Sequence, residues 1–89
     1  MRSRDREEIF SSILNTSGSN GGVRIAKIMF CSYLTHSQVL EYTKTLVERG
    51  FLEYDKINRT FRTTPSGFEF LRYYDEMRQI IEIKQGLNS

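Results

Sequence analysis

The sequence predicts an α+β fold that is mostly helical, made of one small domain followed by a long helix. Three observations lead to this prediction. Apolar residues recur at helical spacing in three segments before residue 50 and in one after residue 67. Between these segments, residues 51–55 and 60–64 form two short runs rich in β-forming residues. At 89 residues the chain has room for a single domain, with the domain proper at 1–67 and the final helix within 68–89.

The first helix is expected from about Arg4 to Asn15. Asp5, followed three residues later by Glu8, resembles a capping box, and both carboxylates suit the positive end of the helix dipole. The density of glycine, serine and asparagine over residues 16–22 predicts a loop after this helix. Its apolar residues share one face and are expected in the core: Ile9, Phe10, Ile13 and Leu14.

Two further helices are expected from about Val23 to Ser32 and from about His36 to Arg49. Thr35 and Gln38 form a Thr-x-x-Gln capping box, and Gly50 stands at the position of a left-handed C-cap. The expected inner faces are Ile25, Ile28 and Met29, with Ala26 and Phe30 beside them, and then Val39, Leu40, Thr43, Leu46 and Val47.

The two β-rich runs predict a hairpin joined by the four residues Lys56–Arg59. Asn58 tolerates the positive φ that such turns often require. Thr64 can cap the last helix and Pro65 suits its first position. This helix is expected to reach about residue 84 or 85, where Gly86 ends it.

A helix–turn–helix followed by a two-stranded hairpin is the winged-helix arrangement. In such folds the second helix of the pair enters the DNA major groove, and the hairpin, or wing, contacts phosphates or the minor groove. Residues 24–64 hold seven basic and four acidic side chains, so the positive excess lies in this motif. The sequence therefore favours a protein that binds double-stranded DNA.

Polar residues on the outer face of the 36–49 helix are candidates for base contacts, because Ser, Gln and Glu all pair with base edges. In an alternative interpretation, Gln38 only caps the helix. Likewise, the cations of the hairpin turn only keep an exposed loop soluble and contact no DNA. Cations before and after this helix suit phosphates. The candidate DNA-binding residues are Arg24, Lys27, Ser37, Gln38, Glu41, Lys44, Lys56, Asn58 and Arg59.

The last helix carries more apolar surface than a small domain can cover. Its apolar positions follow a 3-4-3-4 spacing, which is typical of a coiled-coil seam. They pack either within the chain or against a second copy, and we expect a homodimer with antiparallel packing over few turns. The candidate dimer residues are Phe70, Tyr73, Tyr74, Met77, Ile80, Ile81 and Lys84.

Other classes of function lack a signal in this sequence. It shows no catalytic triad, no phosphate loop and no metal cluster, so we expect a non-enzymatic protein without cofactor, metal or small-molecule ligand. His36 is expected at the surface or in an interface, and Cys31 in the core. No apolar run approaches the ~18 residues that span a bilayer. A cytoplasmic, nucleoid-associated protein is the resulting expectation.

Several motifs resemble the small archaeal winged-helix DNA-binding proteins of about ten kilodaltons, over roughly residues 5–85. They are Leu34-Thr-His-Ser-Gln38, Tyr42, Leu46, Arg49-Gly-Phe-Leu-Glu53, Thr63-Thr-Pro-Ser-Gly67 and Phe70-Leu71. The chain is equally similar to the small winged-helix regulators of archaeal viruses. The resemblance implies that residues 37, 38 and 41 lie on a recognition helix, that 56–59 form the wing tip, and that the last helix forms an antiparallel coiled-coil dimer.

The sequence is compatible with two functions. The first is a dimeric transcriptional regulator or chromosomal protein that binds DNA through the recognition helix and the wing. The second is a winged-helix module for protein–protein contact without DNA, which the exposed Glu41 and Glu48 and the low net charge of +2 favour.

Overall fold

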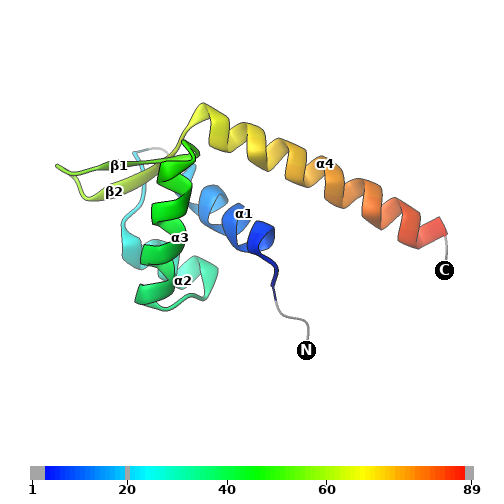
Figure 1. The fold of residues 1–89 in the computed structure, drawn as a ribbon, viewed down its shortest axis with the longest axis horizontal. Helices are drawn as coiled ribbons and strands as arrows, with labels where there is room; N and C mark the ends of the chain where they lie inside the picture. The colour runs from blue at the N-terminus through cyan, green and yellow to red at the C-terminus, as the bar shows by residue number, and fades with distance from the viewer. Residues whose placement is uncertain (1–3, 20, 88–89) are drawn as a thin grey trace.

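The computed structural model describes residues 4–19 and 21–87, and the side chains of residues 4–19 and 21–83. The elements follow in the order α1 (Arg6–Ser17), α2 (Ile25–Ser32), α3 (His36–Glu48), β1 (Leu52–Asp55), β2 (Thr60–Thr63) and α4 (Pro65–Leu87). The mostly helical α+β fold is confirmed, with the helix–turn–helix of α2 and α3 followed by a two-stranded antiparallel wing (Figure 1).

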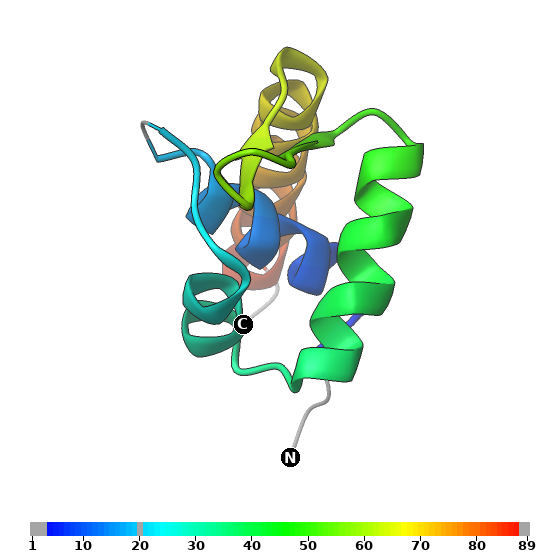
Figure 2. The ribbon, with the colours of Figure 1, turned by 90° about the vertical axis from the view of Figure 1, so that its left-hand side faces the viewer.

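Helix α1 lies at the centre of the domain and contacts α2, α3, α4 and β2 (Figure 2). Its four predicted core residues are all buried, and each fully buried side chain of this size stabilises the fold by about 1.5–3 kcal/mol. One helix thus supplies much of the apolar surface on which the other elements pack. The remaining core residues come from the surrounding elements: Ile28, Leu34, Val39, Leu46, Leu52 and Leu71.

The predicted helix ends are confirmed where a side chain defines them. The Asp5 carboxylate accepts a hydrogen bond from the Glu8 backbone N–H at 2.7 Å, which begins α1. Thr35 and Gln38 form the complete capping box at the start of α3. Gly50 follows α3 with a φ of +79°, the left-handed conformation expected after a helix end.

Several boundaries differ from the sequence prediction. Helix α1 spans Arg6–Ser17 instead of about Arg4 to Asn15, so the first two residues of the expected loop are helical. Helix α2 begins at Ile25, because Val23 is used in an isolated bridge to β2, where its backbone exchanges hydrogen bonds of 2.9 and 2.7 Å with Phe61. Helix α4 continues past Gly86 to Leu87. A glycine inside a helix costs only about 1 kcal/mol relative to alanine, which does not suffice to end it.

The buried strip of the helix–turn–helix is narrower than the apolar pattern suggested. Phe30, Leu40 and Val47 were expected on or beside the inner faces, but all three are exposed. Ala26 is exposed as well. On α3 only Val39, Thr43 and Leu46 are buried, since only one narrow side of this helix meets α1, α2 and β1.

Helix α4 packs on the domain at its start and then leaves it (Figure 1). Leu71 is buried, and the half-buried Phe70 lies 6.4 Å from Phe10 and 5.4 Å from Phe51 between ring centroids. Beyond this point the large apolar side chains face solvent, and the molecule is 51 Å long. The exposed apolar residues of this outer half are Tyr73, Met77, Ile80, Ile81 and Ile83.

Candidate nucleic-acid interface

The wing is a short antiparallel hairpin in which Leu52 pairs with Thr63 and Asp55 pairs with Thr60. Its base is tied to the domain, because the buried Thr63 hydroxyl donates to the Leu14 carbonyl of α1 at 2.7 Å. The bridge from Val23 to Phe61 ties the same strand, β2, to the segment before α2. The tip therefore projects from a rigid base at the end of the molecule opposite the C-terminal end of α4 (Figure 1).

The positive charge of the wing is concentrated at its tip. Arg62, in the strand, is held by Glu53 through contacts of 2.8 Å from Nε and 2.6 Å from Nη2 to one carboxylate oxygen. Lys56 and Arg59 are both exposed, and neither has an ion-pair partner within residues 4–19 and 21–83. The tip thus presents two cations available to an anionic partner.

A single carboxylate organises the turn at the tip. Asp55 accepts hydrogen bonds from the backbone N–H groups of Ile57 at 2.9 Å and Asn58 at 3.2 Å, and from the Asn58 side-chain amide at 2.8 Å. The positive φ predicted for Asn58 falls instead on Arg59, at +56°. Because Asn58 is engaged with Asp55, the chain reverses one residue later. Asn58 therefore shapes the turn.

These hydrogen bonds predict a lowered pKa for the Asp55 carboxyl group. The Asn58 side chain, followed by the backbone amides of Asn58 and Ile57, lowers the pKa of Asp55 below its ordinary 3.8. The charged carboxylate stabilises the turn above this ordinary value, and that stabilisation is lost as the pH falls through the lower folded pKa. We expect a carboxyl-carbon NMR titration to give a midpoint below 3.8 for Asp55 and a return towards 3.8 in Asn58→Ala. An unchanged midpoint in this variant would show that Asn58 does not hold the carboxylate.

The exposed start of α3 presents the predicted recognition residues Ser37, Gln38, Glu41 and Lys44. The Gln38 side-chain oxygen, however, accepts the Thr35 backbone N–H at 2.9 Å as part of the capping box. Bidentate pairing with adenine needs this oxygen as well as the amide donor, so it requires the cap to open. Ser37 and Glu41 reach outward without that competition.

The two predicted cations of α2 lie at its start. Arg24 is the N-cap residue and forms no side-chain capping hydrogen bond, and Lys27 lies less than one turn further on. Both are exposed. Figure 2 looks onto the end of the molecule at which α2, α3 and the wing come together. The structure thus places the predicted DNA-contact residues on the elements that share this end.

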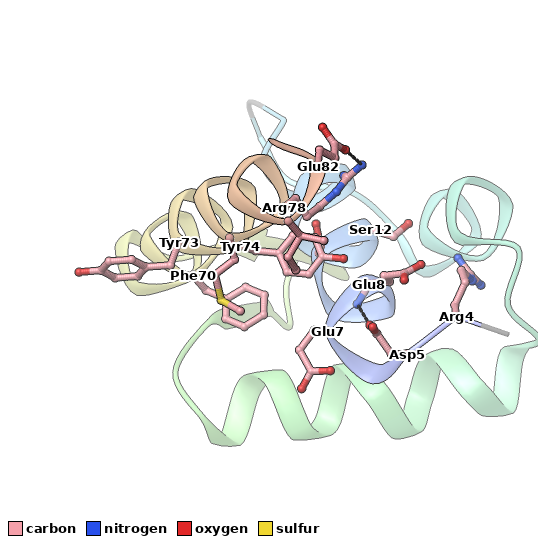
Figure 3. Close-up of a pocket in the computed structure, with 13 residues that line it drawn as sticks. Arg4, Asp5, Glu7, Glu8, Ser12, Phe70, Tyr73, Tyr74, Arg78 and Glu82 are labelled. Carbon is pink, nitrogen blue, oxygen red and sulfur yellow. Dashed lines mark hydrogen bonds and ion pairs between the residues drawn. The ribbon is translucent and has the colours of Figure 1, made fainter. Parts of the chain in front are cut away.

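The predicted dimer residues lie along α4, and several of them line a groove of about 930 Å³ between α4 and the start of α1 (Figure 3). Phe70, Tyr74 and Met77 line the α4 side, and Asp5 and Glu7 line the α1 side. The helix position of Lys84 is described, but its side chain lies outside the described part. Ile83 is an exposed apolar residue that the seam spacing did not include.

Sequence reasoning missed three exposed side chains near the helix–turn–helix and wing. Ile57 at the wing tip is 92% exposed, Tyr33 after α2 is 88% exposed and Phe30 is 80% exposed. Tyr33 also adopts a positive φ of +54°, a conformation that non-glycine residues rarely take. A signal for Ile57 was present, since an isoleucine inside a polar four-residue turn has no core to enter. No signal of that kind marks Phe30, whose helical position is compatible with burial.

Membrane-spanning helices and clusters of potential metal ligands are both absent from the described residues. None of the helices in this part of the chain combines the length and apolar character needed to cross a bilayer. No group of three or more His, Cys, Asp or Glu side chains there is arranged to hold a metal ion.

Comparison with known proteins agrees with the geometry. The winged helix-turn-helix family matches residues 3–82. Among solved structures, the fold is similar to that of Sso10a-2, a DNA-binding protein from Sulfolobus solfataricus, with a TM-score of 0.81 and 20% sequence identity. The match covers 96% of this chain and 90% of that one. No curated protein sequence matches the chain. Since the family match spans most of the sequence, the chain belongs to the winged helix-turn-helix family.

Proposed function

We propose that the protein is a non-enzymatic, homodimeric double-stranded DNA-binding protein that acts as a transcriptional regulator or chromosomal protein. The observation that carries this proposal is the wing tip, where Lys56 and Arg59 are both exposed and neither has an ion-pair partner within the described side chains. Family membership and the fold shared with a DNA-binding protein support it. A nucleoid-associated location in the cytoplasm follows from the same proposal.

In the proposed complex the start of α3 lies in the major groove, with Ser37 and Glu41 facing base edges. Lys44 contacts the phosphate backbone from the same helix, and Arg24 and Lys27 contact it from α2. The wing tip contacts the neighbouring stretch of backbone. Gln38 keeps α3 capped and offers its amide donor, because its oxygen is occupied by Thr35.

Fluorescence anisotropy on a labelled random-sequence duplex tests DNA binding. The expected result is binding at low salt, with an affinity that falls linearly on a log–log plot against salt concentration, because phosphate neutralisation releases counterions. Absence of binding at about 50 mM salt, near the low end of the range over which such electrostatic binding is compared, contradicts the proposal.

A protein–protein role is the second candidate, and the surface of α3 favours it. Leu40 and Val47 are exposed apolar residues, and Glu41 and Glu48 on the same helix repel phosphates. Under this alternative the helix binds another protein, and the anisotropy titration shows no duplex binding at any salt concentration.

The dimer proposal rests on the uncovered apolar face of α4. Tyr73, Met77 and Ile80 are each more than half exposed, although burial of such residues is favourable. A large contiguous apolar patch on a small protein is typical of an interaction site. Because the helix projects from the domain, a second α4 packed antiparallel along it can cover this face and place two wings on one duplex.

The dimer predicts a mass change on substitution. Ile80→Asp puts a charge into the proposed seam and is expected to convert a dimer of twice 10.5 kDa into a monomer, as measured by light scattering or sedimentation equilibrium. Gln79→Asp is the matched control, because it adds the same charge on the adjacent, polar side of α4 and should leave the dimer intact. A wild-type monomer, or a dimeric Ile80→Asp, would contradict the α4 interface.

A further inference from the structure

The turn at the wing tip exposes one apolar side chain, although its other three residues are polar. Ile57 is 92% exposed, the highest value among the exposed large apolar residues of the described chain. It stands between Lys56 and Asn58, and Arg59 follows. An isolated exposed isoleucine on a helix is ordinary, but this one lies in the four-residue turn that joins β1 to β2 at the tip of the wing.

The turn holds Ile57 in this outward position. The Asp55 carboxylate accepts the Ile57 backbone N–H at 2.9 Å and also binds the backbone and side chain of Asn58. Below the tip, the rings of Tyr54 and Phe61 pack with centroids 4.8 Å apart and stiffen the hairpin. The backbone that carries Ile57 is therefore preorganised for contact, so little backbone freedom is lost when the turn binds.

We propose that Ile57 enters the minor groove of duplex DNA as an apolar contact, while Lys56 and Arg59 on either side bind the two phosphate walls. This inference rests on the proposed DNA-binding function and adds to it an apolar contact by a named residue and a base preference. With α3 in the major groove, the wing reaches the adjacent minor groove, which is about 6 Å wide and admits a side chain. Apolar wedges of this kind, isoleucine included, are a known means of minor-groove binding.

The flanking charges argue for DNA over a protein surface. The Asp55 carboxylate accepts hydrogen bonds inside the turn, and Glu53 is paired with Arg62. The charged groups that face outward at the tip are therefore the cations Lys56 and Arg59, on either side of Ile57. An apolar residue between two cations matches a groove with sugar walls between two phosphate strands. The groove floor adds selectivity, because guanine presents its N2 amino group there and A·T pairs do not. The wing is thus expected to favour A·T-rich steps.

A set of single substitutions tests the contact by anisotropy over a range of salt concentrations. Ile57→Ala is expected to bind duplex about tenfold more weakly, with an unchanged log–log salt slope, because it removes apolar burial and no phosphate contact. Ile57→Val keeps a β-branched apolar side chain and should bind about twofold more weakly than wild type, since it removes one of the three side-chain carbons whose loss in Ile57→Ala costs about tenfold. Lys56→Ala should instead lower the slope, by about one unit per contact. Thermal unfolding of Ile57→Ala should match wild type, because the side chain is exposed.

Replacement of guanine by inosine places the contact in the minor groove. Inosine lacks the N2 amino group but keeps the O6 and N7 acceptors of the major groove. Wild type should bind the inosine duplex several-fold more tightly than the guanine duplex, and Ile57→Ala should lose this gain. An unchanged affinity of Ile57→Ala, or an equal inosine gain in both proteins, overturns the minor-groove contact and leaves DNA binding standing. Failure of the wild type to bind any duplex overturns DNA binding itself.

Discussion

Gly67→Ala is expected to destabilise the protein by roughly 3 kcal/mol, a large share of the total for a domain of this size. Gly67 is buried in the first turn of α4, where that helix passes the base of the wing. A Cβ there would overlap the Phe51 backbone carbonyl and lie 2.6 Å from Cγ2 of Thr63. The Phe51 carbonyl cannot move freely, because it accepts the Thr64 N–H at 3.1 Å.

Gly21→Ala is the control, because it introduces backbone strain at a glycine where an added Cβ overlaps nothing. Gly21 has a φ of +83°, but an added Cβ there would meet no atom within 4 Å. Its substitution should therefore cost only the left-handed conformation, about 1–2 kcal/mol. Urea unfolding followed by circular dichroism measures both variants. Equal losses at the two positions would show that the close approach of α4 to Phe51 does not constrain the fold.

Lys56→Ala combined with Arg59→Ala is expected to weaken duplex binding by about 100-fold at low salt and to flatten the salt dependence. Each neutralised phosphate contributes about 0.9 to the log–log slope, and a dimer that uses both wings loses about four such contacts. Anisotropy titrations at several salt concentrations measure the affinity and the slope together. An unchanged affinity and slope would show that the wing does not contact the backbone.

The control for this pair is Arg6→Ala combined with Arg72→Ala. It removes the same charge from α1 and α4, at residues outside the proposed DNA surface. Their guanidinium groups lie over the rings of Phe10 and Tyr73 at 5.1 Å in each case. Because Arg72 lies over Tyr73 of the proposed dimer surface, light scattering checks that this variant has the mass of wild type. We expect a slope close to that of wild type. A loss equal to that of the wing variant would mean that net charge, and not the wing, governs binding.

Local chemistry made much of the fold predictable. The N-cap at Asp5, the capping box at Thr35, the left-handed Gly50 and the change to β-forming residues after it depend on neighbours within a few positions. Thr64 begins α4 as expected, because its hydroxyl oxygen accepts the Gly67 N–H at 3.1 Å. The sequence was therefore sufficient for the order and type of the elements.

Features that depend on distant partners were not predictable in this way. Val23 looked helical because its bridge to Phe61 joins residues far apart in sequence. Periodicity gave the direction of the inner face of α3 but not its width, so Leu40 and Val47 were expected in the core. Near the candidate site, Arg62 is one of the seven basic residues of the 24–64 segment, and only the strand register shows that it lies opposite Glu53 and pairs with it.

The wing tip is the clearest case in the candidate site. Lys56 and Arg59 were predictable from their position in the turn. The rigidity of that turn was not, because it arises from the Asp55 carboxylate bound to Asn58, and the positive φ was expected one residue too early. The exposure of Ile57 had a signal in the sequence, because a polar four-residue turn offers its side chain no core to enter.

Titration of ¹⁵N-labelled protein with a short duplex tests the central claim most directly, since backbone amide shifts report which elements meet DNA. We predict that the largest shifts fall on Lys56–Arg59 and on Ser37–Glu41, with smaller ones at the start of α2 and none along the outer half of α4. Shifts confined to α4, or none at all at low salt, would contradict a DNA interface formed by the wing and α3.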